Sequence, residues 1–459
     1  MQRLRSVFSK INLLRCFPLH SYLPGLENVR PMLVQNVLLF LLVSSVSTGL
    51  FALDSTPLNE ALRKPVLDKR LNMTIGVLGD SRGLTFQAAH GFTSLAQEHP
   101  AEVDTIIAIA SMTKLITTVA ALQLHDEGKL DIDAPVDSYL AELANLKKLT
   151  GFDDSGAAIL VPPERKPTVR ELMSHTSGFV YSMWNRNAMI AEKAGLTGDL
   201  LSGKEMIANA PIAFEPGTRW EYGIGTDWLG LIVEEVSGLT LADYFDENIF
   251  GPLQMKDSFY EIPEQKIERV AHLLFRDEAN TIFKFLSLFS ESDLIEVPLM
   301  SAPRASEKYS SAHYSGGGNL YSTLPDYAKL LQCLLSNGMY EEHRILSGES
   351  INLIFTSEID SPNIGIAKTQ APLFTNDIDM SFGAEASFGL GLLLHPSGIE
   401  SGRHANSGSW GGLFNTYFWI DRDADIYGIF ATQVAPFFDR ASIETLQAFE
   451  SAAYSETAQ

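Results

Sequence analysis

Two residues three positions apart, Ser111 and Lys114, open the stretch IASMTKLITTVAALQLHDEG and could perform nucleophilic chemistry. On a helix, residues i and i+3 share a face with Cβ atoms about 5–6 Å apart, so the lysine can reach the serine hydroxyl. A lysine that is partly buried near other donors gives up its proton more readily and can act as a base. Free N–H groups in the first helical turn favour developing negative charge. The pair predicts a nucleophile and its base.

Two other interpretations compete with this one. A serine and a lysine at this spacing are expected about once by chance in a chain of this length, as a polar pair on an exposed helix edge. A second serine, Ser81 in GDSRG, satisfies the pattern of a nucleophile elbow. That elbow needs a strand, a sharp turn and then a helix, whereas the strand-like LTFQAAHG follows Ser81. We therefore interpret Ser81 as part of a polar hairpin turn.

The elements around these residues alternate between strand-like and helical patterns. A hairpin is expected over 74–91, and a helix over 111–127 that Gly128 closes. A mostly helical stretch follows, and apolar strand-like segments then precede a terminal helix. This order predicts one α/β domain interrupted by a helical domain, with a site in the cleft between them. The expected strand-like segments are GLGLLL (389–394), NTYFWID (415–421) and DIYGIFATQV (425–434). The expected divisions are a signal peptide or membrane anchor (1–53), the first part of the α/β domain (54–134), the mostly helical domain (135–311) and the second part of the α/β domain (312–459).

The first 53 residues differ from the rest of the chain. They carry five Lys and Arg residues against the single acid Glu27, and then an uncharged run from Pro31 to Leu53. The apolar part of that run is short for a membrane span and fits a signal peptide, with cleavage near Leu50. We expect an exported protein, periplasmic or extracellular. The same segment could instead stay attached as a membrane anchor. The 31 residues before Met32 are long for the basic start of a signal peptide, which is consistent with translation that begins at Met32. A mitochondrial presequence is the alternative to export.

Composition excludes several classes of protein. A net charge of −22 argues against a nucleic-acid partner, because phosphates need stripes of Lys and Arg. The two cysteines are Cys16 and Cys333, and removal of a leader would leave no intrachain disulfide. The ten histidines form no HExxH or i,i+4 pair, and no nucleotide-binding glycine motif is present. We expect no metal and no cofactor, and the sequence carries no signal for the oligomeric state.

Five ordered blocks resemble a known superfamily. They are IASMTKLITTVAALQLHDEGKLDIDAPVDSYL, TVRELMSHTSGF, FEPGTRWEYGIGTDWLGLIVEEVSG, FGPLQMKDSFY and SGGGNLYSTLPDYAKLLQCLLSNG. Together they resemble the serine β-lactamase and penicillin-binding-protein superfamily, in its class C-like branch, over roughly residues 60–450. The resemblance implies an α+β fold in which an antiparallel sheet is flanked by helices and a mostly helical domain is inserted. It also implies that Ser111 is acylated, that Lys114 is the base, and that Tyr222, in place of the family's Tyr-x-Asn tyrosine, relays the proton.

Two departures from the family pattern narrow the expected activity. Ile224 stands where the family has the asparagine whose amide anchors a lactam or peptide side chain, and isoleucine offers no such contact. The third family motif, Lys-Thr-Gly or His-Thr-Gly, is replaced by Trp410, Gly411 and Gly412, which resemble the WGG motif of family VIII carboxylesterases. His404 is a weaker candidate for that motif, because no Thr-Gly follows it.

The resemblance then implies a serine esterase that acts on short-chain carboxylic esters through an acyl-enzyme. The backbone N–H groups of Ser111 and Leu413 would hold the oxyanion, and such donors are worth on the order of 3 kcal/mol each. Tyr181 and Trp184 would form walls of the acyl pocket, and His175 would brace its loop rather than act in catalysis. The alternatives are a β-lactamase or D-amino-acid-specific peptidase, and an acyltransferase or non-catalytic relative. The expected partner is a small-molecule ester.

Overall fold

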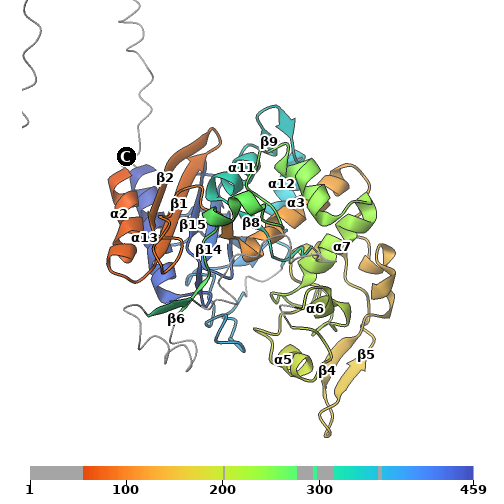
Figure 1. The fold of residues 1–459 in the computed structure, drawn as a ribbon. Helices are drawn as coiled ribbons and strands as arrows, with labels where there is room; N and C mark the ends of the chain where they lie inside the picture. Colours follow the sequence, from red (N-terminus) through yellow and green to blue (C-terminus); the bar gives the residue numbers. More distant parts are fainter. Residues whose placement is uncertain (1–54, 200–201, 277–292, 297–313, 360–363, 458–459) are drawn as a thin grey trace, which may run out of the picture. The chain divides into compact units, whose positions relative to one another are not determined.

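The main element of the computed structural model is an antiparallel sheet that joins strands from the beginning and the end of the described chain (Figure 1). Within the described residues this sheet has seven strands, in the order β11-β12-β13-β14-β15-β1-β2. Strand β1 pairs with β15, so early and late parts of the sequence lie side by side. The strands are β1 (Met73–Asp80), β2 (Gly83–Gly91), β11 (Ser387–Phe388), β12 (Leu393–His395), β13 (Ser407–Gly412), β14 (Thr416–Asp421) and β15 (Ile426–Ala431).

The predicted signal peptide or anchor lies outside the described residues, and so does Cys16. Within the described part, no helix is both long and apolar enough to cross a membrane. Export therefore stays a prediction. The structure describes residues 55–199, 202–276, 293–296, 314–359 and 364–457.

Helices cover both faces of the sheet, which explains why its central strands are apolar on both sides. On β14, the ring centre of Phe418 lies 5.3 Å from that of Tyr327 in α11. The ring centre of the next residue, Trp419, lies 6.0 Å from that of Phe449 in α13. Because successive strand residues point to opposite faces, α11 and α13 lie on opposite sides of the sheet. Helix α2 packs beside α13, since a Cβ atom on Gly76 of β1 would meet both helices. These helices are α2 (Ser55–Leu67), α11 (Leu324–Leu335) and α13 (Arg440–Thr457).

The chain between β2 and β11 holds most of the remaining helices, together with short strands. Its central helix, α3, is buried along most of its length and packs against α7. The helices are α3 (Thr113–Asp126), α4 (Val169–Met173), α5 (Arg186–Lys193), α6 (Lys204–Ala208), α7 (Gly225–Ser237), α8 (Leu241–Phe245) and α12 (Gly348–Ile354). The short strands, one of them after the main sheet, are β3 (Ile107–Ala108), β4 (Lys148–Phe152), β5 (Ala158–Val161), β6 (Leu274–Arg276), β7 (Leu294–Glu296), β8 (Tyr321–Ser322), β9 (Met339–Tyr340), β10 (His343–Arg344) and β16 (Val434–Ala435).

Three details differ from the sequence-based expectation. The segment GLGLLL is a strand only from Leu393, because Gly391 has φ of 79° in a turn that interrupts it. The helix expected from position 111 begins with a 3-10 turn, Ala110–Met112, and becomes α-helical at Thr113. Helix α2 was not expected at all, since its polar sequence and its internal Pro65 hide the apolar stripe that packs on the sheet. The predicted family fold is nevertheless the one observed.

Candidate active site

The turn that carries Ser111 comes directly before α3 and has unusual backbone geometry. Ser111 is partly exposed, whereas its neighbour Met112 is buried. Ala110 has φ of 44°, in the left-handed region that costs a residue with a Cβ atom about 1–2 kcal/mol. The Thr113 hydroxyl donates a hydrogen bond of 2.7 Å to the Ala110 carbonyl and so holds this turn. Strained backbone of this kind is concentrated at functional sites.

Lys114 lies one turn further along and is almost completely buried, with 1% of its surface exposed. Its Nζ atom donates to Ser111 Oγ at 3.3 Å, to the Tyr181 hydroxyl at 3.0 Å and to the Gly317 carbonyl at 2.6 Å. An ammonium group has three N–H donors, and all three are used here. The predicted nucleophile and base are therefore in direct contact, and the lysine is held in one orientation.

Two tyrosines flank the lysine, and only one bonds to it. The Lys114 Nζ lies 5.0 Å from the centre of the Tyr222 ring and 5.2 Å from that of Tyr181. Among the described residues the Tyr222 hydroxyl has no hydrogen-bond partner, whereas the Tyr181 hydroxyl accepts from Lys114 Nζ at 3.0 Å. The predicted proton relay through Tyr222 stays a prediction. Burial, with smaller contributions from Asp227 and Tyr222, raises the pKa of Tyr181 well above its usual value. Tyr181 therefore stays a neutral phenol.

Aromatic rings surround Tyr222 and fix its position. The ring centres of His175, Trp410 and Trp184 lie 4.9, 5.0 and 5.3 Å from that of Tyr222. Burial, and then the charge of Lys114, holds the pKa of His175 well below its usual value, so this imidazole is neutral. His175 thus braces the tyrosine as well as its own loop. Trp184 and Trp410, both predicted site residues, also belong to this wall.

The end of β13 brings the WGG motif to the nucleophile. A Cβ atom on Gly412 would lie 2.2 Å from the carbonyl oxygen of Ile109, so only glycine permits the strand to approach the Ser111 turn this closely. Gly411 precedes it, and a Cβ atom there would meet the ring of Tyr417. Leu413 follows at the strand end and is half-buried. An oxyanion hole formed by the N–H groups of Ser111 and Leu413 remains a prediction at this junction.

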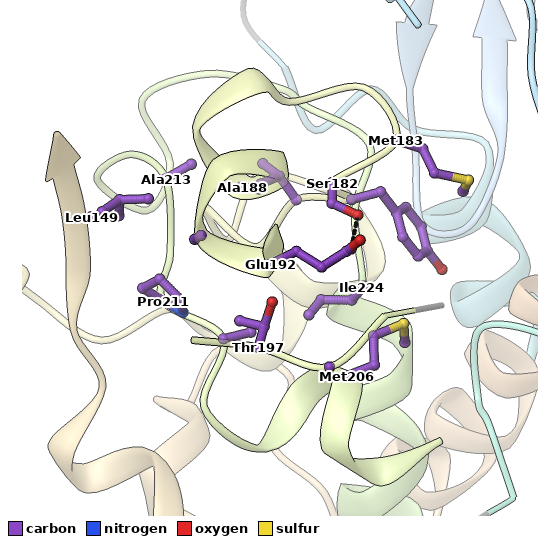
Figure 2. Close-up of a pocket in the computed structure, with 15 residues that line it drawn as sticks. Leu149, Ser182, Met183, Ala188, Glu192, Thr197, Met206, Pro211, Ala213 and Ile224 are labelled. Carbon is purple, nitrogen blue, oxygen red and sulfur yellow. Dashed lines mark hydrogen bonds between the residues drawn. The ribbon is translucent and has the colours of Figure 1, made fainter. Parts of the chain in front are cut away.

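Ile224 lies directly before α7 and, together with Tyr181, lines a pocket of about 40 Å³ (Figure 2). This volume exceeds the roughly 10–15 Å³ that one water molecule needs on the same measure. Its one polar contact drawn in Figure 2 is the hydrogen bond from the Ser182 hydroxyl to Glu192. Apolar side chains supply much of the remaining wall, among them Leu149, Val180, Met183, Ala188 and Met206.

The competing serine and histidine lie elsewhere. Ser81 occupies the turn between β1 and β2, which confirms the hairpin interpretation, and its hydroxyl donates to Asp425 at 2.8 Å. His404 is more than half exposed and pairs with Asp421 beside Tyr454, so it does not take part in the Ser111 site.

The sequence analysis missed two members of the site. Gly317 belongs to the SGGG run of a family-like block, but no role was assigned to it, although its carbonyl holds Lys114. Asp227 is completely buried in the first turn of α7 and accepts a hydrogen bond of 3.1 Å from the Gly317 N–H. The available signal was an acidic residue inside an otherwise apolar helix, GTDWLGLIV.

Comparison with known proteins agrees with this geometry. A buried lysine contacts a serine at the start of a central helix, beside the end of a sheet strand, which is the arrangement that the sequence blocks predicted for a serine acyl-enzyme. The family model described as beta-lactamase matches residues 63–452, which is most of the chain. The chain belongs to this family, as its five sequence blocks indicated.

Individual relatives include both hydrolytic and transfer enzymes. The chain is 28% identical to a lovastatin esterase of Penicillium rubens, over 79% of this chain and 89% of the relative. It is also 28% identical to a monacolin J acid methylbutanoyltransferase of Aspergillus terreus, over 90% of this chain and 99% of the relative.

Solved structures give the same picture. A simvastatin synthase mutant from Aspergillus terreus has a TM-score of 0.72 at 26% identity, covering 88% of this chain and 95% of that one. A family VIII carboxylesterase has a TM-score of 0.57 at 19% identity, covering 86% and 96%, which shows a shared fold alone. The protein is therefore a serine hydrolase-type member of the family, related to both esterases and acyltransferases.

Proposed function

We propose that this protein is a serine acyltransferase. It moves a short carboxylic acyl group from an ester-class donor to an alcohol through an acyl-enzyme on Ser111, and ester hydrolysis is the competing reaction with water. The observation that carries the proposal is the contact between the Nζ atom of buried Lys114 and the partly exposed Ser111 hydroxyl, 3.3 Å apart. It places a base beside a nucleophile that a substrate can reach.

The chemistry requires Lys114 as the neutral amine, which accepts the hydroxyl proton of Ser111 as Oγ attacks the donor carbonyl. The tetrahedral oxyanion is stabilised by the N–H groups of Ser111 and Leu413, and it collapses as the donor alkoxide leaves with a proton. Tyr222, whose ring centre lies 5.0 Å from Lys114 Nζ and whose hydroxyl has no hydrogen-bond partner among the described residues, would pass this proton on. The acceptor alcohol then repeats the attack on the acyl-enzyme, which releases a new ester and restores Ser111.

Transfer is favoured over hydrolysis as the main activity because of the relatives. The methylbutanoyltransferase aligns over nearly its whole length, whereas the esterase aligns over a smaller share of this chain. An esterase, with an acyltransferase as an alternative, is the expectation from the sequence, and these relatives support that alternative. Ester hydrolysis keeps its place as the second candidate, since one close relative is named for it.

The pocket beside Tyr181 and Ile224 supports a short acyl group. Its volume of about 40 Å³ is small, and Ile224, Val180 and Met206 present apolar surface. An aliphatic acyl chain buried there gains about 0.8 kcal/mol for each CH₂ group. A lactam with an amide side chain would instead leave that amide unpaired against Ile224, which argues against a β-lactamase or peptidase.

The test measures how the acyl-enzyme is partitioned. Purified protein is incubated with p-nitrophenyl butyrate alone and with a series of added alcohols, and acid and new ester are both quantified. We expect the new ester to rise with alcohol concentration while p-nitrophenol release is conserved. Release of acid alone with every alcohol would replace the transferase by an esterase. Faster turnover of nitrocefin than of the ester would replace both by a β-lactamase.

A further inference from the structure

Asp227 is a buried carboxylate that the mechanism above does not use. It is 0% exposed in the first turn of α7. Its Oδ1 atom accepts from the Ser315 hydroxyl at 2.5 Å and from the Gly317 N–H at 3.1 Å, whereas Oδ2 has no partner among the described residues. Taking a carboxylate out of water is costly unless a charge or several donors compensate it. A role for this buried carboxylate in the site would account for the cost of burying it.

The peptide group of Gly317 connects this carboxylate to Lys114. Its N–H points to Asp227, and its carbonyl accepts from Lys114 Nζ at 2.6 Å. The loop is fitted closely onto α7, because a Cβ atom on Gly317 would lie 2.5 Å from Asp227 Oδ2, and one on Gly316 would lie 2.2 Å from the Thr226 carbonyl. The anion, the peptide and the cation therefore form one rigid chain of contacts.

The geometry points to Asp227 as a positioning residue that sets the orientation and protonation of Lys114 through the Gly317 peptide. The carboxylate holds the N–H, the polarised carbonyl holds the ammonium, and the negative charge stabilises the positive one. A hydrogen bond is strengthened when its peptide is polarised by another bond in a low-dielectric interior. This inference rests on the proposed function, in which Lys114 is the base.

Other titratable groups face this pair, and most of them are neutral. Tyr181, Tyr222 and His175 lie around Lys114. Tyr181 and Tyr260 lie around Asp227, and burial raises the pKa of both phenols well above its usual value. The pKa of His175 is held well below its usual value by burial. Asp227 is therefore the anion of this set that can compensate the lysine.

The decisive variant is Asp227→Asn in the full chain, which keeps an acceptor oxygen for Gly317 and removes the charge. An ammonium group holds its proton less tightly when a nearby anion is removed. We expect the acid limb of kcat/KM against pH, measured with p-nitrophenyl butyrate, to move down by about one pH unit. The plateau should fall about tenfold through kcat, with KM nearly unchanged. An unmoved limb would overturn the inference.

Two further variants separate charge from structure. Ser315→Ala removes one bond to the carboxylate but keeps its charge, so its acid limb should stay in the wild-type position. Asp326→Asn is the matched control, because Asp326 is likewise an acid in the first turn of a helix and 5% exposed, but bonds to Lys329 and the Asp257 N–H. It should lower thermal stability without moving the limb. An equal shift in Asp326→Asn would also overturn the inference.

A rescue variant protects the test against misfolding of Asp227→Asn. Ser315→Asp made in the Asp227→Asn background returns one carboxylate to the same contact, where the amide introduced at position 227 can donate to it, so the acid limb should move back to higher pH. A limb that stays at the position of Asp227→Asn contradicts the inference. Trapping of an acyl group on Ser111, read by mass spectrometry of the wild-type protein, is scored separately. Its failure would refute the proposed function, whereas normal trapping with an unmoved limb refutes the role of Asp227 alone.

Discussion

Two serines in short catalytic-looking motifs, Ser81 and Ser111, are both partly exposed but have opposite surroundings. Ser81 lies in a hairpin turn, where its hydroxyl and its N–H both donate to Asp425 and the neighbouring Asp80 pairs with Arg82. Ser111 lies at the start of a buried helix, 3.3 Å from a buried lysine. The exposure of the serine is thus similar in the two regions, and only the partners differ.

The two serines differ in the contacts of the group next to them, and under the proposed function these contacts decide which serine is the nucleophile. Asp425 accepts hydrogen bonds from Ser81, and the carboxylate of the neighbouring Asp80 is already paired with Arg82. At the Ser111 site the lysine is bound on all sides, by Ser111, Tyr181 and Gly317, so its orientation does not depend on a substrate. Preorganisation of this kind removes the reorganisation cost at the moment of reaction.

The largest expected difference between the two regions is in the rate. Ser111→Ala should lower kcat for p-nitrophenyl butyrate by several orders of magnitude, on the scale of ~10⁶ for the loss of a nucleophile. Ser81→Ala should stay within a few-fold of wild type, because it removes only a hairpin hydrogen bond. The check is steady-state kinetics on both variants at matched thermal stability. If Ser81→Ala were the inactive variant, the elbow interpretation would replace ours.

This contrast was predictable from the sequence because both motifs are local. The turn at Gly79–Gly83 is followed by alternating residues that make a strand, and the run after Ser111 has helical spacing without proline or glycine. Strands β14 and β15 were also expected, since their apolar runs are continuous. In each case a local pattern of residues predicts the element, although the contacts of Ser81 with Asp425 come from far along the chain.

The phenol contacts give the next largest effect. Tyr222→Phe should lower kcat by about 10²–10³, the range of a lost proton relay. Tyr181→Phe should cost about tenfold, because it removes one hydrogen bond to an ammonium that keeps two others. The kcat values of the two variants with p-nitrophenyl butyrate show which substitution costs more. The reverse order would make Tyr181 the relay and Tyr222 a packing residue.

The pairing of Lys114 with Tyr181 could not be read from the sequence, because it depends on long-range packing. Tyr181 is 67 residues from Lys114, and Gly317 is 203 residues from it. No local pattern states which of two aromatic residues points its hydroxyl at a lysine. The same reason hid Asp227, whose partners come from the loop at Ser315–Gly317.

Acid should also distinguish the Ser111 region through His175. Because the folded pKa of His175 lies well below the unfolded value of about 6.5, the unfolded state binds its proton first as the pH falls. The contribution of neutral His175 to the free energy of unfolding is therefore complete above about pH 6.5. Below that pH this contribution is lost, by up to about 1.4 kcal/mol for each pH unit. His175→Phe keeps a ring but cannot titrate. Urea unfolding at pH 7 and 5.5 should show a smaller acid loss in this variant.

The matched change on the Ser81 side is Arg82→Gln. The pKa of Arg82 is raised by Asp80, so this guanidinium stays charged in folded and unfolded chains at both pH values. Its removal should leave the difference in unfolding free energy between pH 7 and 5.5 at the wild-type value. An equal acid loss in wild type and His175→Phe would mean that His175 is protonated in the folded protein.

The smallest expected effect is one of selectivity, at Ile224. This residue is 3% exposed between Tyr222 and α7 and lines the pocket of about 40 Å³, so under the proposed function we expect it to contact the acyl chain rather than the leaving group. Ile224→Asn restores an amide where the family has one. It should raise the nitrocefin-to-butyrate ratio of kcat/KM only a few-fold, because Trp410 still occupies the place of a Lys or His. Ile224→Val, which keeps an apolar wall, is the control and should leave the ratio unchanged. A ratio that falls in Ile224→Asn, or rises equally in Ile224→Val, would show that the pocket does not read the acyl group through this side chain.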